Sequence, residues 1–361
     1  MNEPPRPWPE GPPLPFRRPR HPIIELLPPA EDMQPAPPPP RPKYWLAVLL
    51  FLLTAFTATT LGPVTYLLSR TDVQTDLITV IPGLPELGYL IFLSPRVIAA
   101  VWGDPRLLRI GLAFSLPALT ILLAHELGHY IACRRYRLPS TLPYFLPIPL
   151  NFGTFGAFIK IQAPIRSKKE LFDVGIAGPI AGFLALIPFL LYGIAHSEPA
   201  SLSASPPGGL LALGKCLAIE LAWLLFHGPH GGDTYLNLHP VALGAWLGLL
   251  ATAINLIPLG QLDGGHILYA ATGRLQRRLA LPLWLALGLV GFYWPGWLLW
   301  CLVVLLIGLH HPPVRDERIP LDRKRRLLAW LALLIFALSF MPVPLDLLQV
   351  PGPAGLESQP R

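Results

Sequence analysis

The chain has 361 residues, of which 52% are hydrophobic and only 14% charged, and its formal net charge is +7. This balance is typical of a protein whose solvent is largely lipid, and it excludes the pair of soluble domains that the length alone would allow. Because the Lys and Arg residues lie in short clusters between apolar runs, they indicate membrane orientation and exclude nucleic acid as the expected partner.

Residues 1–43 form a proline-rich segment of mixed charge that includes the run from Pro37 to Pro40. Proline removes a backbone donor and blocks helix formation, so we predict a disordered tail. The segment lacks the apolar core and cleavage site of a secretory signal peptide. We expect it to act as a spacer, with docking of an SH3-like partner as the alternative.

Apolar runs suited to membrane helices, which need about 20 residues, follow this tail. The predicted spans are 44–68, 111–133, 171–195, 240–259, the helical hairpin of 279–293 and 297–309, and 327–341. Two other apolar segments are not expected to cross fully. Residues 69–109, broken by proline, glycine and Arg96, are interpreted as an interfacial or re-entrant connection. Residues 210–226 carry Lys215 and Glu220 at their centre, which favours an interfacial helix.

The predicted fold class is therefore an all-α polytopic membrane protein with about six to seven transmembrane helices. Its basic loops all fall on one side if the spans alternate as drawn. These loops are residues 134–137, 166–169, 274–278 and 315–326. The positive-inside rule makes this side cytoplasmic, which places the amino terminus inside and the carboxyl terminus outside.

Residues 125–129 read His-Glu-Leu-Gly-His within the second predicted span. Positions i and i+4 share one face of a helix, so the imidazoles of His125 and His129 can reach one metal ion. Glu126, next to a ligand, can accept a proton from the attacking water. Ionisable groups inside a membrane helix are costly and usually mark a site. We predict a metal site near the cytoplasmic face; a chance pattern or two hydrogen-bonded buried histidines is the alternative.

A catalytic zinc site usually has three protein ligands, and the best third candidate is Asp263. It follows the 240–259 span, where Pro258 and paired glycines are predicted to break the helix and let the carboxylate swing toward the metal. An ordinary Asp-Gly turn is the alternative. His266 is a rival ligand, although a supporting role is favoured. Asn255 can bind the substrate backbone or a reaction oxygen, or can simply make a polar contact between helices.

Residues 151–162 follow three prolines and are rich in strand formers, which argues against a helix. Apolar backbone of this kind should line a cavity in a membrane protein. We predict a re-entrant, β-hairpin-like segment that offers a strand edge to an unwound substrate, with a surface loop as the alternative. Its expected substrate-binding residues are Gly153, Phe155 and Gly156.

Small residues also recur in the span of residues 171–195, where Gly178 and Gly182 are separated by one helical turn. Small side chains at i and i+4 allow two helices to approach closely. We therefore expect this span to pack against the helix that carries the metal motif. Packing alone explains the pattern.

Taken together, these motifs resemble the site-2 protease family of intramembrane zinc metalloproteases, above all the subgroup typified by plant chloroplast members and their bacterial relatives. The resemblance covers roughly residues 107–272, and its anchors are residues 125–129, 153–157, 172–179 and 255–265. The first motif is shared with many soluble proteases. Its pairing with the later Leu-Asp-Gly-Gly in a membrane chain is specific. Gly260 stands where many members have a second proline, a departure that is frequent in the chloroplast-like subgroup.

The resemblance implies a Zn²⁺ ion bound by His125, His129 and Asp263, with Glu126 as base and acid and Asn255 helping to hold substrate. It implies cleavage of single-pass or membrane-tethered proteins in the lipid bilayer, in regulated intramembrane proteolysis that often follows a first cut by a site-1-type protease.

On this interpretation the chain divides into four parts. Residues 1–43 are a cytoplasmic tail, and 44–110 hold the first helix and the interfacial connection. Residues 111–272 form the catalytic core, and 273–361 hold the C-terminal helices. The bacterial character of the resemblance and the lack of a transit-like leader predict the bacterial cytoplasmic membrane.

Two other classes of function stay open. A metal transporter would use the predicted ligands and the loop of residues 227–233 as a pathway, but it needs ligands at staggered depths, whereas the sequence shows one cluster. A catalytically inactive scaffold is disfavoured because every expected catalytic residue is present.

Overall fold

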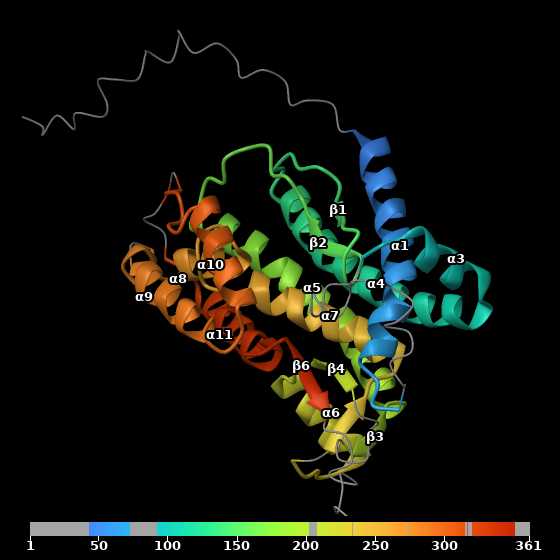
Figure 1. Cartoon of the computed structure of the whole chain (residues 1–361). Helices are drawn as coiled ribbons and strands as arrows, with labels where there is room; N and C mark the ends of the chain where they lie inside the picture. The colour runs from blue at the N-terminus through green and yellow to red at the C-terminus, as the bar shows by residue number, and fades with distance from the viewer. Residues whose placement is uncertain are drawn as a thin grey trace, which may run out of the picture. The chain divides into compact units, whose positions relative to one another are not determined.

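The computed structural model describes residues 43–72, 92–201, 208–232, 234–273, 275–314, 316 and 320–350. The predicted tail, except for its last residue, and residues 73–91 of the predicted interfacial connection lie outside the described residues. The described part is mostly helical, with three short pairs of β-strands (Figure 1).

Within the described ranges, three helices are long and apolar enough to cross a membrane. They are α1 (Tyr44–Leu68), α4 (Pro105–Arg135) and α5 (Lys168–Ala195). At about 1.5 Å per residue each exceeds the roughly 30 Å hydrocarbon core. Helix α4 begins earlier than predicted because Asp104 caps it by accepting a hydrogen bond from the Arg106 N–H, with Pro105 in the first turn.

The other long apolar segments form helices that are shorter than a straight span requires. They are α7 (Pro240–Asn255), α9 (Leu275–Val290), α10 (Gly296–Ile307) and α11 (Arg323–Ser339). Helices α9 and α10 pack against each other, as the predicted helical hairpin requires. Helix α7 is buried along nearly its whole length and packs against both α4 and α5, so it forms the centre of the helical core. Its neighbours therefore supply the apolar environment that lipid supplies to a longer helix.

Residues 210–226 do not form the single interfacial helix that the sequence predicted. The chain instead forms strand β4 (Gly208–Leu213) and then helix α6 (Leu217–His227). Strand β4 pairs antiparallel with β6 (Leu345–Val350), and the Gly214 N–H donates to the Pro344 carbonyl. Pairing with a segment from the far end of the chain satisfies the backbone of the first half, which therefore does not need to be helical.

Two short helices and a second strand pair lie around these elements. Helix α3 (Pro95–Gly103) packs against α1 and α4, and helix α8 (Asp263–Thr272) packs against α5. Strands β3 (Glu198–Ser201) and β5 (Thr234–Asn237) form a second antiparallel pair.

The β1–β2 hairpin confirms the predicted strand character of this segment. Strands β1 (Tyr144–Pro147) and β2 (Thr154–Phe158) pair antiparallel, with an irregularity after Phe145. The turn is fixed to α1 by two hydroxyl groups: Thr57 Oγ1 donates to the Gly153 carbonyl at 2.6 Å, and Thr65 Oγ1 donates to the Asn151 carbonyl at 3.0 Å. Gly153 has a φ of +75°, and a Cβ there would lie 2.4 Å from the Ala58 nitrogen, so only glycine fits this close approach.

Replacing Thr57 with valine should loosen the hairpin. The change keeps the shape of the side chain but removes the shorter of the two hydrogen bonds to the Gly153 carbonyl, which keeps only that from the Ile148 N–H at 3.2 Å. The loss should lower the free energy of unfolding by about 0.5–1.5 kcal/mol. Thermal unfolding in detergent and limited proteolysis within the hairpin measure the effect. Thr54→Val is the matched control, because Thr54 Oγ1 donates to the Leu50 carbonyl of its own helix. Equal losses in both variants would show that the contact with the hairpin contributes nothing.

Candidate metal centre

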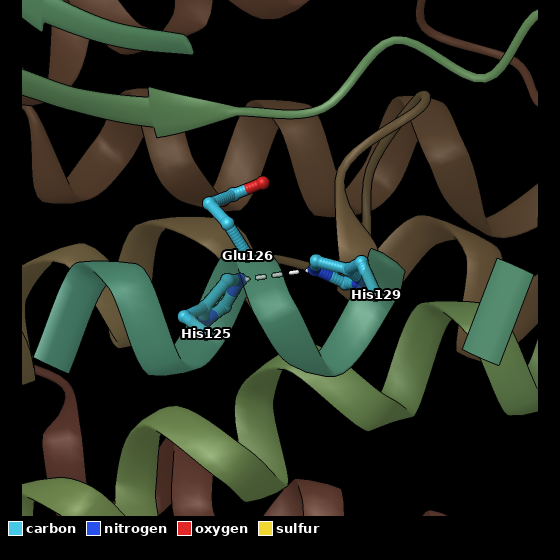
Figure 2. A group of neighbouring side chains, drawn as sticks. All are labelled: His125, Glu126 and His129. Atoms are coloured by element: carbon cyan, nitrogen blue, oxygen red, sulfur yellow. Dashed lines mark hydrogen bonds between the residues drawn. The ribbon is translucent and has the colours of Figure 1, made fainter. Parts of the chain in front are cut away.

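Helix α4 presents two imidazoles on one face, as the spacing of the motif predicted. The Nε2 atoms of His125 and His129 lie 3.1 Å apart, and both side chains are buried. Figure 2 shows the two rings directed toward one another, while Glu126 extends from the helix toward a neighbouring strand segment. Glu126 lines the same cavity as Ile159, which comes just after β2. Glu126 therefore lies between the helix and the hairpin.

Asp263 reaches the same point from a distant part of the chain. Its Oδ2 lies 3.1 Å from His125 Nε2 and 3.3 Å from His129 Nε2, and its side chain is 14% exposed. Asp263 is the first residue of α8, and Asn255 is the last residue of α7. The structure thus brings together the three side chains that the sequence proposed as metal ligands. It also places Asn255 Nδ2 at 3.4 Å from His125 Nε2.

The helix break before Asp263 differs in detail from the prediction. Residues 256–262 form the break, and Gly264 and Gly265 lie inside the first turn of α8. A Cβ on Gly264 would lie 2.0 Å from the Leu256 carbonyl oxygen, and one on Gly265 would lie 2.4 Å from that of Gly260. The paired glycines therefore do not end a helix. They allow α8 to start directly against the broken segment, which places Asp263 beside α4.

The hydrogen bonds around His129 test whether these residues suit a cation. His129 Nδ1 lies 2.7 Å from the Val174 carbonyl of α5, so Nδ1 carries the proton. Nε2 of the neutral ring then carries a lone pair and can only accept. That lone pair faces a carboxylate oxygen of Asp263, which is also an acceptor. A cation between them satisfies both. With bonds of about 2.0–2.1 Å, the donor atoms of a tetrahedral zinc site lie roughly 3.3 Å apart, so the residues fit zinc. Val174 left no signal in the sequence, because it acts through its backbone.

Helix α5 packs directly beneath the two imidazoles, which confirms the expected contact between its small residues and α4. A Cβ on Gly178 would lie 2.1 Å from His129 Nε2, and one on Gly182 would lie 3.0 Å from His125 Cβ. On the facing helix, a Cβ on Gly128 would lie 2.4 Å from the Ala177 carbonyl oxygen. These glycines leave the space that the two rings occupy.

A cavity of about 230 Å³ opens beside the cluster. His125, Glu126, His129 and Asp263 line it together with Asn255, His266 and residues 157–159 and 161 after the hairpin turn. It therefore combines the groups proposed for chemistry with an apolar strand segment on one side. This is the arrangement expected of a site that holds an extended peptide.

The residues predicted to bind substrate lie elsewhere on the hairpin. Gly153 is packed against α1, and Gly156, with a φ of +102°, would place a Cβ more than 4 Å from any described neighbour. Phe155 is 52% exposed and stacks on Trp300 of α10, with ring centroids 5.7 Å apart. Of the described residues that line the cavity, the hairpin segment contributes those that follow Gly156. Their assignment as substrate-binding residues remains a prediction.

The loop of residues 227–232 does not join the metal cluster. His227 Nε2 lies 2.8 Å from the Ile194 carbonyl, while His230 lies 3.3 Å from Glu220 and stacks on Trp223 of α6. Asp233 lies outside the described residues. Both described histidines are thus engaged by local groups, and neither lines the cavity of the metal cluster.

A helical, membrane-embedded protein with a His-Glu-x-x-His helix and a converging aspartate defines a recognised class, the membrane metallopeptidases. Residues 113–286 match the model of peptidase family M50. This match and the relatives below support the site-2 protease family for this chain.

Three curated relatives from plants illustrate the similarity. The chain is 33% identical over 257 residues to probable zinc metalloprotease EGY2, chloroplastic, of Oryza sativa subsp. indica, which covers 66% of this chain and 44% of the relative. It is 31% identical over 248 residues to EGY1 of Oryza sativa subsp. japonica (64% and 38%) and 28% identical over 310 residues to EGY1 of Arabidopsis thaliana (83% and 53%). The chain thus spans about half or less of the length of these relatives.

Proposed function

We propose that this chain is an intramembrane zinc metalloprotease that hydrolyses peptide bonds within or near transmembrane segments of membrane-tethered proteins. The observation that carries the proposal is the convergence of His125, His129 and Asp263 within 3.1–3.3 Å, next to the buried Glu126. The names of the plant relatives, as probable zinc metalloproteases, support the same chemistry.

The residues divide the chemistry between them. His125, His129 and Asp263 would hold Zn²⁺, which lowers the pKa of water and polarises a carbonyl when it is bound. Glu126 accepts the proton of the attacking water and returns it to the leaving amine. Its carboxylate shares the cavity lining with Ala157, Phe158 and Ile159 of the hairpin segment, beside which the peptide would lie.

The substrate enters as an extended peptide. A helix hides its carbonyls in hydrogen bonds, so it must unwind before attack, and helix-breaking residues in the substrate should promote cleavage. Asn255 lies at the cavity wall, where its amide can hold the substrate backbone. The β1–β2 hairpin, re-entrant from the cytoplasmic side, offers its edge to the peptide. Lipid surrounds the site, and a site-1-type protease makes a preceding cut in regulated intramembrane proteolysis.

We further propose a topology of six to seven spans with a cytoplasmic amino terminus, in a bacterial cytoplasmic membrane. A polar cluster supports a common side for three helix ends: Arg325 at the start of α11 donates to Asp173 near the start of α5 at 2.6 Å, and Tyr136 at the end of α4 also donates to Asp173. These ends carry the predicted basic loops. His129 lies roughly 9 Å along α4 from Arg135, so the site is near this side.

Removing the metal should stop the reaction reversibly. We expect a zinc chelator to abolish cleavage of a tagged single-pass protein by the purified chain in lipid nanodiscs, and added zinc to restore it. The fraction of substrate cleaved, measured by gel, gives the result. Cleavage that persists without metal would contradict the proposal. Zinc flux into vesicles by a protein that cleaves nothing would support a transporter in its place.

A further inference from the structure

A second pair of histidines lies next to the metal cluster. His266, one turn after Asp263 on α8, lines the same cavity as the cluster. Its Nδ1 lies 2.8 Å from Nε2 of His311, which follows α10. His311 is 5% exposed and stacks on Tyr269, with ring centroids 4.5 Å apart and planes at 21°. The two imidazoles thus connect the cavity to a buried part of the loop between α10 and α11.

The loop that carries His311 is fixed at several points. The Gly260 N–H donates to the Leu309 carbonyl, and Gln261 Nε2 donates to the Ile307 carbonyl, both at 3.2 Å. The His311 N–H donates to Gln276 Oε1 at 3.4 Å. Because these contacts bind the loop to the segment just before Asp263 and to α9, the position of His311 is tied to that of the metal cluster.

The hydrogen bonds of His311 determine which nitrogen of His266 carries the proton. His311 Nδ1 lies 2.5 Å from the Pro312 carbonyl, which can only accept, so Nδ1 of His311 is the donor. Nε2 of the neutral His311 ring is then a lone pair and can only accept from His266. His266 must therefore carry its proton on Nδ1, which leaves a lone pair on its Nε2.

A peptide unwound inside a membrane protein needs acceptors for its N–H groups, because a buried N–H that has lost its helical hydrogen bond is costly to leave unpaired. Most acceptors of this cavity are already engaged. The Nε2 atoms of His125 and His129 and the Asp263 carboxylate face one another, and Glu126 is assigned to the attacking water. Among the described residues of the lining, Nε2 of His266 is an acceptor that neither the metal nor the attacking water requires, as are the side-chain oxygens of Asn255 and Gln261.

We propose that His266 binds the substrate by accepting a hydrogen bond from a backbone N–H at Nε2, and that His311 is the positioning residue that fixes the tautomer of His266. This inference rests on the proposed protease function and deepens it, because it assigns one wall of the cavity to backbone recognition. Recognition of this kind is independent of the substrate's side chains. It therefore suits an enzyme that recognises an unwound segment by its backbone and not by its amino-acid sequence.

The test begins with His311→Phe, which keeps an aromatic ring against Tyr269 but removes the acceptor for His266. Without that acceptor His266 can place its proton on Nε2, and cleavage should lose roughly tenfold in kcat/KM, mainly through KM, with zinc content unchanged. His311→Gln offers a carbonyl oxygen to His266 and should recover most of the loss. In a His266→Phe background, His311→Phe should cause no further loss. Independent losses that multiply would mean that His311 has only a structural role, and would overturn the inference.

A second measurement does not depend on cleavage. In protein labelled with ¹⁵N-histidine, nitrogen chemical shifts report the tautomer, and the His266 signal is assigned by its loss in His266→Phe. We expect Nδ1–H in the wild type and a shift toward Nε2–H in His311→Phe. Nε2–H in the wild type would refute the assignment. Cleavage assays of wild type and Glu126→Gln, run together, separate the proposed protease function from the proposed role of His311. If neither variant nor wild type cleaves, the protease function fails, while the spectrum still decides the role of His311.

Discussion

Glu126→Gln is expected to keep one zinc ion per chain and to lose cleavage by about 100- to 10,000-fold. Glutamine has the shape of glutamate but cannot accept a proton from the attacking water. If Glu126 does not ligate the metal, zinc stays with His125, His129 and Asp263. Zinc content by atomic spectroscopy and cleavage of a tagged single-pass protein in nanodiscs measure the two effects separately.

The control for this variant is Glu220→Gln on α6. Glu220 lies 3.3 Å from His230 and 3.6 Å from Lys215, and it does not line the cavity of the metal cluster. We expect the cleavage rate of Glu220→Gln to stay within about twofold of the wild-type rate. Cleavage at the wild-type rate by Glu126→Gln would exclude Glu126 as the base. Loss of zinc from that variant would make Glu126 a ligand.

Gly178→Ala is expected to lower the affinity for zinc by at least about 100-fold. The added Cβ would lie 2.1 Å from His129 Nε2, well inside the 3.0 Å that real Cβ atoms essentially never approach. The ring cannot keep its position, and α5 cannot simply retreat, because its Val174 carbonyl also orients His129. Titration of the metal-free protein with zinc, followed by calorimetry, measures the affinity.

Gly103→Ala is the matched control for this helix substitution. Gly103 ends α3, and a Cβ there would have no neighbour within 4 Å among the residues that the structure describes, so zinc affinity should not change. Thermal unfolding of both variants without metal shows whether Gly178→Ala damages the helix pair as a whole. Unchanged zinc affinity in Gly178→Ala would mean that the metal is not held by His129.

Local patterns explain the parts of the structure that the sequence predicted well. The helices α1, α4 and α5 extend over long continuous apolar runs, and their ends agree with the expected spans within a few residues except at the start of α4. The pairing of His125 with His129 follows from helical periodicity alone. Asp263 was identified from its position after a broken span and from the family resemblance, and the structure places it beside both histidines.

Contacts between distant segments explain what the sequence did not predict. Strand β4 depends on β6 more than a hundred residues later, so an apolar pattern at 210–226 could not distinguish a strand from a helix. The part of the hairpin that reaches the cavity depends on how Gly153 docks on α1. The backbone carbonyl of Val174 orients His129, and that of Pro312 orients His311. Every residue type has a backbone carbonyl, so the sequence does not indicate these roles.

The threonine contacts of α1 bear on how small a working enzyme can be made. The family match begins at residue 113, and the expected core begins at 111, so the match alone would set the start of a minimal fragment at that point. Such a fragment would lack Thr57 and Thr65, whose hydroxyls hold the turn of the hairpin. The segment of the hairpin from Ala157 to Ile159 in turn forms part of the cavity that Glu126 lines. The shortest active piece should therefore start before Tyr44, and α1 supplied as a separate peptide should rescue a shorter one.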